Sequence, residues 1–122
     1  MNRVALAILI AAAAADLWFV RALQPSTLVA GLLLAGWLLT PRAVSAAWLV
    51  VARGSRRQSA VAGIVTTIVA AAGTSRLIDV IYAHPDPQGP IAVVLTPIYE
   101  MAALVVLAPV SAWLAARRRA AR

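Results

Sequence analysis

The chain has 122 residues, of which 63% are hydrophobic, and its mean hydropathy is +0.89. Soluble domains have ~45–50% apolar residues, so this composition argues against a water-soluble domain and indicates a single integral membrane domain over residues 1–122. The net charge of +7 comes from 11 basic residues, all arginine, that lie mostly at the ends of apolar runs. This placement is typical of membrane topology signals and argues against nucleic-acid binding, while the lack of cysteine excludes disulfides and thiolate metal ligands.

The first predicted helix covers about residues 3–23. Its apolar stretch, Val4 to Val20, approaches the ~20 residues that cross a bilayer. A basic start, an apolar centre and a run of alanines also resemble a cleavable signal peptide, so removal of Met1 to Ala15 stays an alternative. Because the apolar run is longer than the ~7–15 residues of a signal core, we expect a retained helix.

A second helix is predicted for about residues 27–52, after a turn at Pro25. Pro41 lies near its middle and removes one backbone hydrogen bond, so we expect a kink there. The hydroxyl of Thr40 is placed to satisfy a freed carbonyl.

The third helix is predicted for about residues 59–83 and the fourth for about residues 91–116. The third is rich in alanine and glycine, which permit close approach of a neighbouring helix. Three prolines and a glycine within residues 84–90 predict a loop between the two helices. Residues 117–122 are expected to form a basic cytoplasmic tail.

These elements predict an all-α fold, a four-helix transmembrane bundle of two helical hairpins with both termini on the same side. That side would hold eight of the arginines: Arg3, Arg53, Arg56, Arg57, Arg117, Arg118, Arg119 and Arg122. The positive-inside rule then places both termini in the cytoplasm and the chain in the plasma (inner) membrane. Aromatic belts are expected at the inner end from Trp48 and Trp113 and at the outer end from Trp18, Phe19 and Tyr82.

An internal duplication is one alternative for the origin of the two hairpins. Aligning Leu39 to Ala52 with Leu95 to Ala108 matches a Leu-Thr-Pro triplet and several small residues. Such matches arise easily in this composition. Pro41 also lies nearer to the following arginines than Pro97 does, by about 12 Å along the helix axis.

Two charged residues are expected deep inside the bundle, Arg42 on the second helix and Glu100 on the fourth. Ionisable groups inside a membrane cost at least ~2.5–3.5 kcal/mol each, so they need partners or a wet cavity. An ion pair between Arg42 and Glu100 is the most economical arrangement. It would serve as a structural bridge or, alternatively, as a protonatable or ligand-binding site.

Four further charged residues are expected near the outer ends of the first and third helices: Asp16, Arg21, Arg76 and Asp79. Arg76 and Asp79 are three residues apart and share a helix face, and Asp16 is expected within reach of Arg76. The group is interpreted as a polar network that holds the two helices in register, with a substrate entrance as the alternative.

No metal or cofactor site is predicted. His84 and Asp86 in the proline-rich loop are too few for a ligand set, and no phosphate-binding loop or Ser/His/Asp arrangement is present. The expected partners are the lipid bilayer, anionic lipid head groups at the arginine clusters, and further copies of this chain or a larger membrane complex.

The sequence favours a small, non-enzymatic accessory or structural subunit of the membrane, because small residues abound and reactive groups are scarce. The alternative is a small oligomeric transporter or channel that uses Glu100 and Arg42 inside the bundle. An intramembrane enzyme is the least favoured class.

Overall fold

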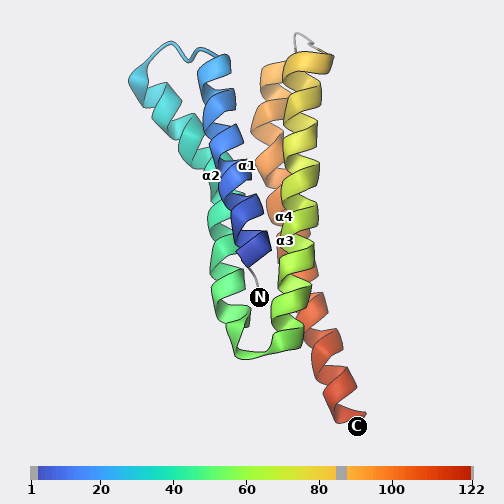
Figure 1. Cartoon of the computed structure of the whole chain (residues 1–122). Coiled ribbons are helices and arrows are strands. Elements are labelled where there is room, and N and C mark those ends of the chain that lie inside the picture. Colours follow the sequence, from blue (N-terminus) through green and yellow to red (C-terminus); the bar gives the residue numbers. More distant parts are fainter. Residues whose placement is uncertain (1–2, 85–87, 122) are drawn as a thin grey trace.

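The computed structural model describes residues 3–84 and 88–121, and within them it contains four long helices and no strand (Figure 1). The helices are α1 (Arg3–Ala22), α2 (Leu28–Val51), α3 (Arg56–Ile78) and α4 (Gly89–Ala120). A 3₁₀ turn, η1 (Ala52–Gly54), follows α2, and a π-helical turn, η2 (Asp79–Ala83), extends α3. All four helices are long and apolar enough to cross a membrane, which confirms the predicted all-α class.

The helix ends differ from the predicted ones at both ends of the second hairpin. Helix α3 starts at Arg56 and α4 continues to Ala120, so Arg117, Arg118 and Arg119 belong to a helix and not to a separate tail. Alanine and arginine are good helix formers, and nothing in this segment breaks the helix. Arg122 lies outside the described residues, as does Asp86 of the predicted loop.

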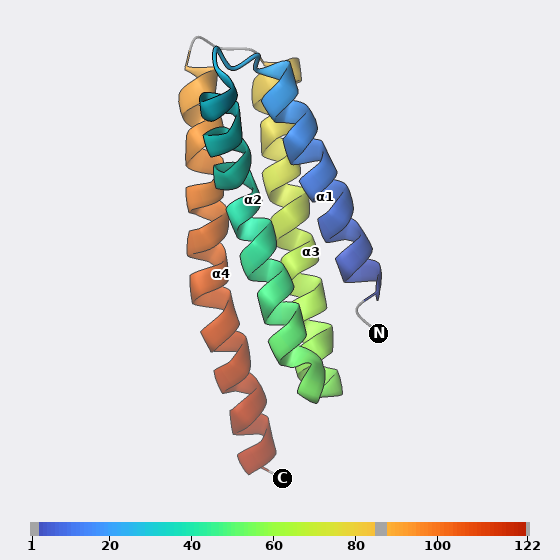
Figure 2. The ribbon, with the colours of Figure 1, turned by 90° about the vertical axis from the view of Figure 1, so that its left-hand side faces the viewer.

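Consecutive helices run antiparallel and form two hairpins, α1–α2 and α3–α4 (Figure 1). Helix α1 packs on α2 and α3, and α4 packs on the same two helices, so α1 and α4 occupy opposite corners of the bundle. The start of α1, the η1 turn and the end of α4 lie toward one end of the bundle, where α4 projects beyond its neighbours (Figures 1 and 2).

Helix α2 bends near its middle, and its first half leans away from the bundle axis (Figure 1). Pro41 lies inside the helix at this level and is buried. Its missing N–H leaves the carbonyl of Trp37 without a helical donor. The hydroxyl of Thr40 does not reach that carbonyl but donates to the carbonyl of Gly36 (2.8 Å). Thr96, before Pro97, makes the same kind of bond to the carbonyl of Ala92 (2.8 Å).

The apolar core consists of two separate layers. The layer nearer the η1 end contains mainly small side chains, namely Ala5, Leu9, Ala12, Leu49, Ala52, Ala62 and Ala70. The layer nearer the opposite end contains larger ones, namely Phe19, Val20, Leu38, Leu77 and Val93. On each of α1, α2 and α3 a short interval separates the two layers, and the buried charged residues of α1 and α2 fall in it.

Aromatic side chains tie the helices together at the end away from η1. The indole of Trp18 donates to the hydroxyl of Tyr82 (3.0 Å), and the indole of Trp37 donates to the carbonyl of Val94 (2.8 Å). Phe19 is only 3% exposed and belongs to the core, so the prediction that it joins an outer aromatic belt is wrong. The preceding Leu17 and Trp18 are exposed, whereas Phe19 continues the buried stripe of Ala12 and Asp16.

Candidate functional site

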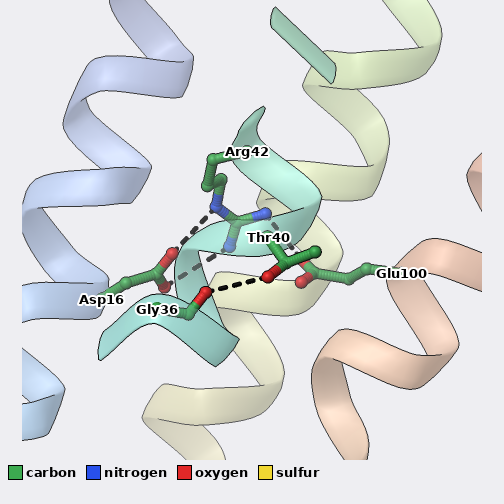
Figure 3. Close-up of polar contacts among 5 residues, drawn as sticks. All are labelled: Asp16, Gly36, Thr40, Arg42 and Glu100. Carbon is green, nitrogen blue, oxygen red and sulfur yellow. Dashed lines mark hydrogen bonds and ion pairs between the residues drawn. The ribbon is translucent and has the colours of Figure 1, made fainter. Parts of the chain in front are cut away.

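A cluster of three charged side chains, Asp16, Arg42 and Glu100, lies in the interior of the bundle (Figure 3). The guanidinium of Arg42 donates through Nε to Oδ2 of Asp16 (3.0 Å), through Nη2 to Oδ1 of Asp16 (3.4 Å) and through Nη1 to Oε1 of Glu100 (2.6 Å). Asp16 is 1% exposed, Arg42 5% and Glu100 6%. One guanidinium therefore joins α1, α2 and α4 in the interior of the bundle.

Helix direction explains why these three side chains meet. In an α-helix the Cα–Cβ bonds tilt toward the N-terminus. Helices α2 and α4 begin at the end of the bundle where α1 ends (Figure 1). Arg42 and Glu100 therefore reach toward that end, and Asp16 reaches the opposite way. The charges converge although their Cα atoms lie at different depths.

Helix α3 contributes no charged side chain to the cluster, but it leaves the space that Glu100 occupies. A Cβ atom built on Gly73 of α3 would overlap the Oε1 and Cδ atoms of Glu100. The carboxylate of Glu100 therefore lies directly against the backbone of α3, in room that only glycine leaves. Sequence reasoning had treated the small residues of this helix alike, as packing positions, and nothing in the sequence distinguished Gly73 from its neighbours.

The structure contains the Arg42–Glu100 ion pair that the sequence suggested, but it adds Asp16, which sequence reasoning had grouped with Arg76. Counted along the helices, Asp16 lies about 9 Å before the end of α1 and Arg42 about 21 Å after the start of α2. On that count Asp16 is expected near the outer end of the bundle and Arg42 deeper inside it. The count left out the opposite directions of the two side chains and the length of the arginine, which together close the gap.

The predicted outer network of Asp16, Arg21, Arg76 and Asp79 is not the arrangement found. Asp79 pairs with the Nδ1 of His84 (2.7 Å), and the guanidinium carbon of Arg76 lies 5.0 Å from the ring centroid of Tyr99. The cause is η2: a π-helical turn places residues five apart above one another, so Asp79 faces His84 instead of Arg76. Arg21 is exposed and makes no ion pair with any described residue.

The cluster contains two carboxylates and one guanidinium. No other charged side chain of residues 3–84 and 88–121 lies within ion-pair distance of it. Ionised carboxylates without compensation are strongly disfavoured in a medium of low dielectric constant. The arrangement can therefore clamp three helices, and its surplus carboxylate can take up one proton or one monovalent cation.

Glu100 borders a cavity. A groove of about 310 Å³ runs between α3 and α4, and its walls include Gly73, Ala103, Leu107 and one edge of Glu100. Asp16 and Arg42 do not line it. Exchange of a proton or a ligand between this groove and the cluster would therefore take place at Glu100.

The room at Gly73 gives a direct test of the packing around Glu100. We expect Gly73→Ala to lower the free energy of unfolding by about 1–3 kcal/mol, because the new methyl group displaces the carboxylate from Arg42. Gly36→Ala is the matched control, since a Cβ there meets nothing within 4 Å, and we expect no loss. Unfolding in mixed micelles, followed by circular dichroism, measures both. Equal stability of the two variants would show that Glu100 does not occupy this space.

The numbers of positive and negative charges in the cluster predict which substitutions destabilise the bundle most. Arg42→Gln leaves two carboxylates without a cation and should destabilise the bundle by about 3–5 kcal/mol. Glu100→Gln leaves a balanced Arg42–Asp16 pair and an amide oxygen that still accepts from Arg42, so we expect a loss of only about 1 kcal/mol.

The yield of folded protein and its unfolding in mixed micelles measure the stability of the two variants. A result in which Glu100→Gln is the more damaging change would contradict the assignment of Arg42 as the centre of the cluster. Exchanging Arg42 and Glu100 for one another is a poorer test, because the new glutamate at position 42 would face Asp16.

Comparison with protein-family models, with curated proteins and with solved structures finds no match to this chain. The function must therefore be argued from the charge cluster and from the surfaces of the bundle.

Proposed function

We propose that the chain is a multi-pass protein of the plasma (inner) membrane, crossing it four times with both termini in the cytoplasm. The four long apolar helices support membrane insertion. The arginine pattern supports the orientation, because Arg53, Arg56 and Arg57 lie near the η1 end of the bundle, as do the arginines at the end of α4. The guanidinium of Arg117 lies 4.0 Å from the ring centroid of Trp113, a pairing suited to the level of anionic lipid head groups.

Within that membrane we propose a non-enzymatic role as an accessory or structural subunit, without a cofactor. One observation carries this proposal: the buried charged groups are engaged with one another, at 1–6% exposure, and hold three helices together. Such a closed cluster is suited to fixing helix positions.

The partner would be a larger membrane complex or a second copy of this chain. Large apolar side chains on the outer face of α2, including Leu28, Leu32 and Leu33, are 64–79% exposed. Helix α1 exposes small residues, such as Ala11 and Ala14, that allow close approach of another helix. These surfaces would meet either lipid or a neighbouring membrane protein.

A small oligomeric transporter or channel is the second candidate, and a different observation favours it. The cluster has one carboxylate in excess, and Glu100 borders the groove between α3 and α4. A carboxylate that can gain and lose a proton or cation at the edge of a cavity is the element that a proton-coupled carrier needs. Four helices enclose little space, so such a carrier would work as an oligomer.

The proposed orientation is testable by cysteine labelling, since the native chain has no cysteine. We expect Ser26→Cys, in the turn between α1 and α2, to react with a membrane-impermeant maleimide in intact cells. Gly54→Cys, in the η1 turn, should react only after permeabilisation, because that turn would face the cytoplasm. Both sites are exposed. The reverse labelling pattern would overturn the orientation.

The proposed role predicts a companion protein. Affinity purification of the tagged chain in mild detergent, with mass determination of the intact complex, should recover a stable membrane partner in fixed stoichiometry. Partner recovery should fall for Arg42→Gln, because the helices that present the outer surface lose their clamp, and stay unchanged for the control Arg21→Gln.

A homo-oligomer without another protein would exclude a larger complex as the partner and leave either transport or a self-associating structural protein. Proteoliposomes that contain a pH-sensitive dye then separate the remaining possibilities. Proton movement that is present for the native chain and lost for Glu100→Gln would support a carrier. Absence of proton movement in the native chain would leave a self-associating structural protein.

A further inference from the structure

Arg76 on α3 stands apart from the charge cluster and has no acidic partner among residues 3–84 and 88–121. Its side chain is exposed, and its guanidinium lies over the ring of Tyr99 on α4. A guanidinium in an apolar setting retains strong affinity for anions, with five N–H donors that match the oxygens of phosphate. Arg76 is therefore an unsatisfied anion-binding group at the surface between two helices.

Two cavities meet at Arg76. Below it lies the groove of about 310 Å³ between α3 and α4, and above it lies a second cavity of about 280 Å³ that reaches His84 and Gly89 at the end of the hairpin. Both cavities include Arg76 in their walls. Arg76 therefore places a cation at the border of both cavities.

The lower groove has mostly apolar walls and is open along its side. Its rim includes Ile68, Tyr99 and Leu107, which are 62%, 55% and 40% exposed. From the level of Tyr99 to Leu107 it extends about 12 Å along α4. The hydrocarbon of one leaflet is about 15 Å thick, so the groove matches most of the depth that one acyl chain occupies.

We propose that the groove and Arg76 bind one anionic phospholipid, with its phosphate on Arg76 and one acyl chain between α3 and α4. The head group then occupies the upper cavity near His84. This inference rests on the proposed insertion of the chain in a membrane, and it is independent of the accessory or transport role.

The charges at the groove favour an anionic phospholipid over a hydrophobic cation. A hydrophobic cation is the other class of ligand that a carboxylate in an apolar cavity suggests. Glu100 already accepts a hydrogen bond from Arg42 at 2.6 Å and is 6% exposed. Arg76 covers the ring of Tyr99, which is the aromatic side chain among the described residues of the groove wall and the face that a cation would use. Of the two charged side chains in the groove wall, Arg76 is exposed and Glu100 is buried.

Native mass spectrometry of the purified protein in an equimolar mixture of phosphatidylglycerol and phosphatidylcholine tests the proposal. We expect one retained lipid per chain and a preference of about fivefold for phosphatidylglycerol, which corresponds to ~1 kcal/mol for a single arginine contact. Arg76→Gln should abolish the preference. Arg21→Gln, an exposed arginine near the same end of the bundle, is the matched control and should keep it.

A second variant tests the acyl-chain part of the site. Ala103→Phe fills the groove without changing a charge, and it should remove the retained lipid while the helix content stays native. Equal retention of the two lipids by the native chain, or a preference that survives Arg76→Gln, overturns the site. Retention that survives Ala103→Phe overturns the groove as the place of the chain. Labelling of the Ser26→Cys and Gly54→Cys variants reports membrane insertion independently of lipid binding. Failure of lipid binding is therefore distinguishable from failure of membrane insertion.

Discussion

The position of one buried guanidinium determines most of this structure. An arginine in a medium of low dielectric constant needs compensating charge and acceptors for its five N–H donors. Asp16 and Glu100 supply compensating charge and accept three hydrogen bonds from Arg42, and they come from two helices at opposite corners of the bundle. Helices α1 and α4 are linked through α2 by this contact. The position of α3 follows, because Gly73 must lie where the carboxylate of Glu100 needs room.

The rest of the packing is consistent with lipid as the solvent. Apolar surface gains little when it leaves hydrocarbon for a protein interior, so helices in membranes associate through close packing and polar contacts. The alanine-rich layer near η1 allows close approach, and indole hydrogen bonds from Trp18 and Trp37 join helices at the opposite end. The charge cluster between these regions provides the directional contact that apolar packing lacks. Small side chains thus set the spacing of the helices, and the cluster sets their register.

Helix number, approximate helix bounds and the ion pair of Arg42 with Glu100 followed from hydropathy, proline positions and the rule that buried charges are paired. Three features did not. Asp16 was misplaced because depth along a helix axis ignores side-chain direction. The pairing of Asp79 with His84 depends on a π-helical turn, which has no local sequence signal. The role of Gly73 depends on the side chain that faces it from another helix. Each of these features depends on three-dimensional contacts, which neither the hydrophobic periodicity nor the amino-acid composition of the sequence specifies.

Two prolines flank the cluster closely, and this placement bears on both functional candidates. Pro41 precedes Arg42 directly, Pro97 lies one turn before Glu100, and both are buried. Each removes a helical hydrogen bond and so weakens the resistance of its helix to bending. A permanently paired cluster would prevent bending of α2 at Pro41 and of α4 at Pro97, as a structural subunit requires. A cluster whose surplus carboxylate gains and loses a proton would release α4 from α2 at the level where both helices bend most easily, as a carrier requires. The charge state of Glu100 therefore separates the two roles.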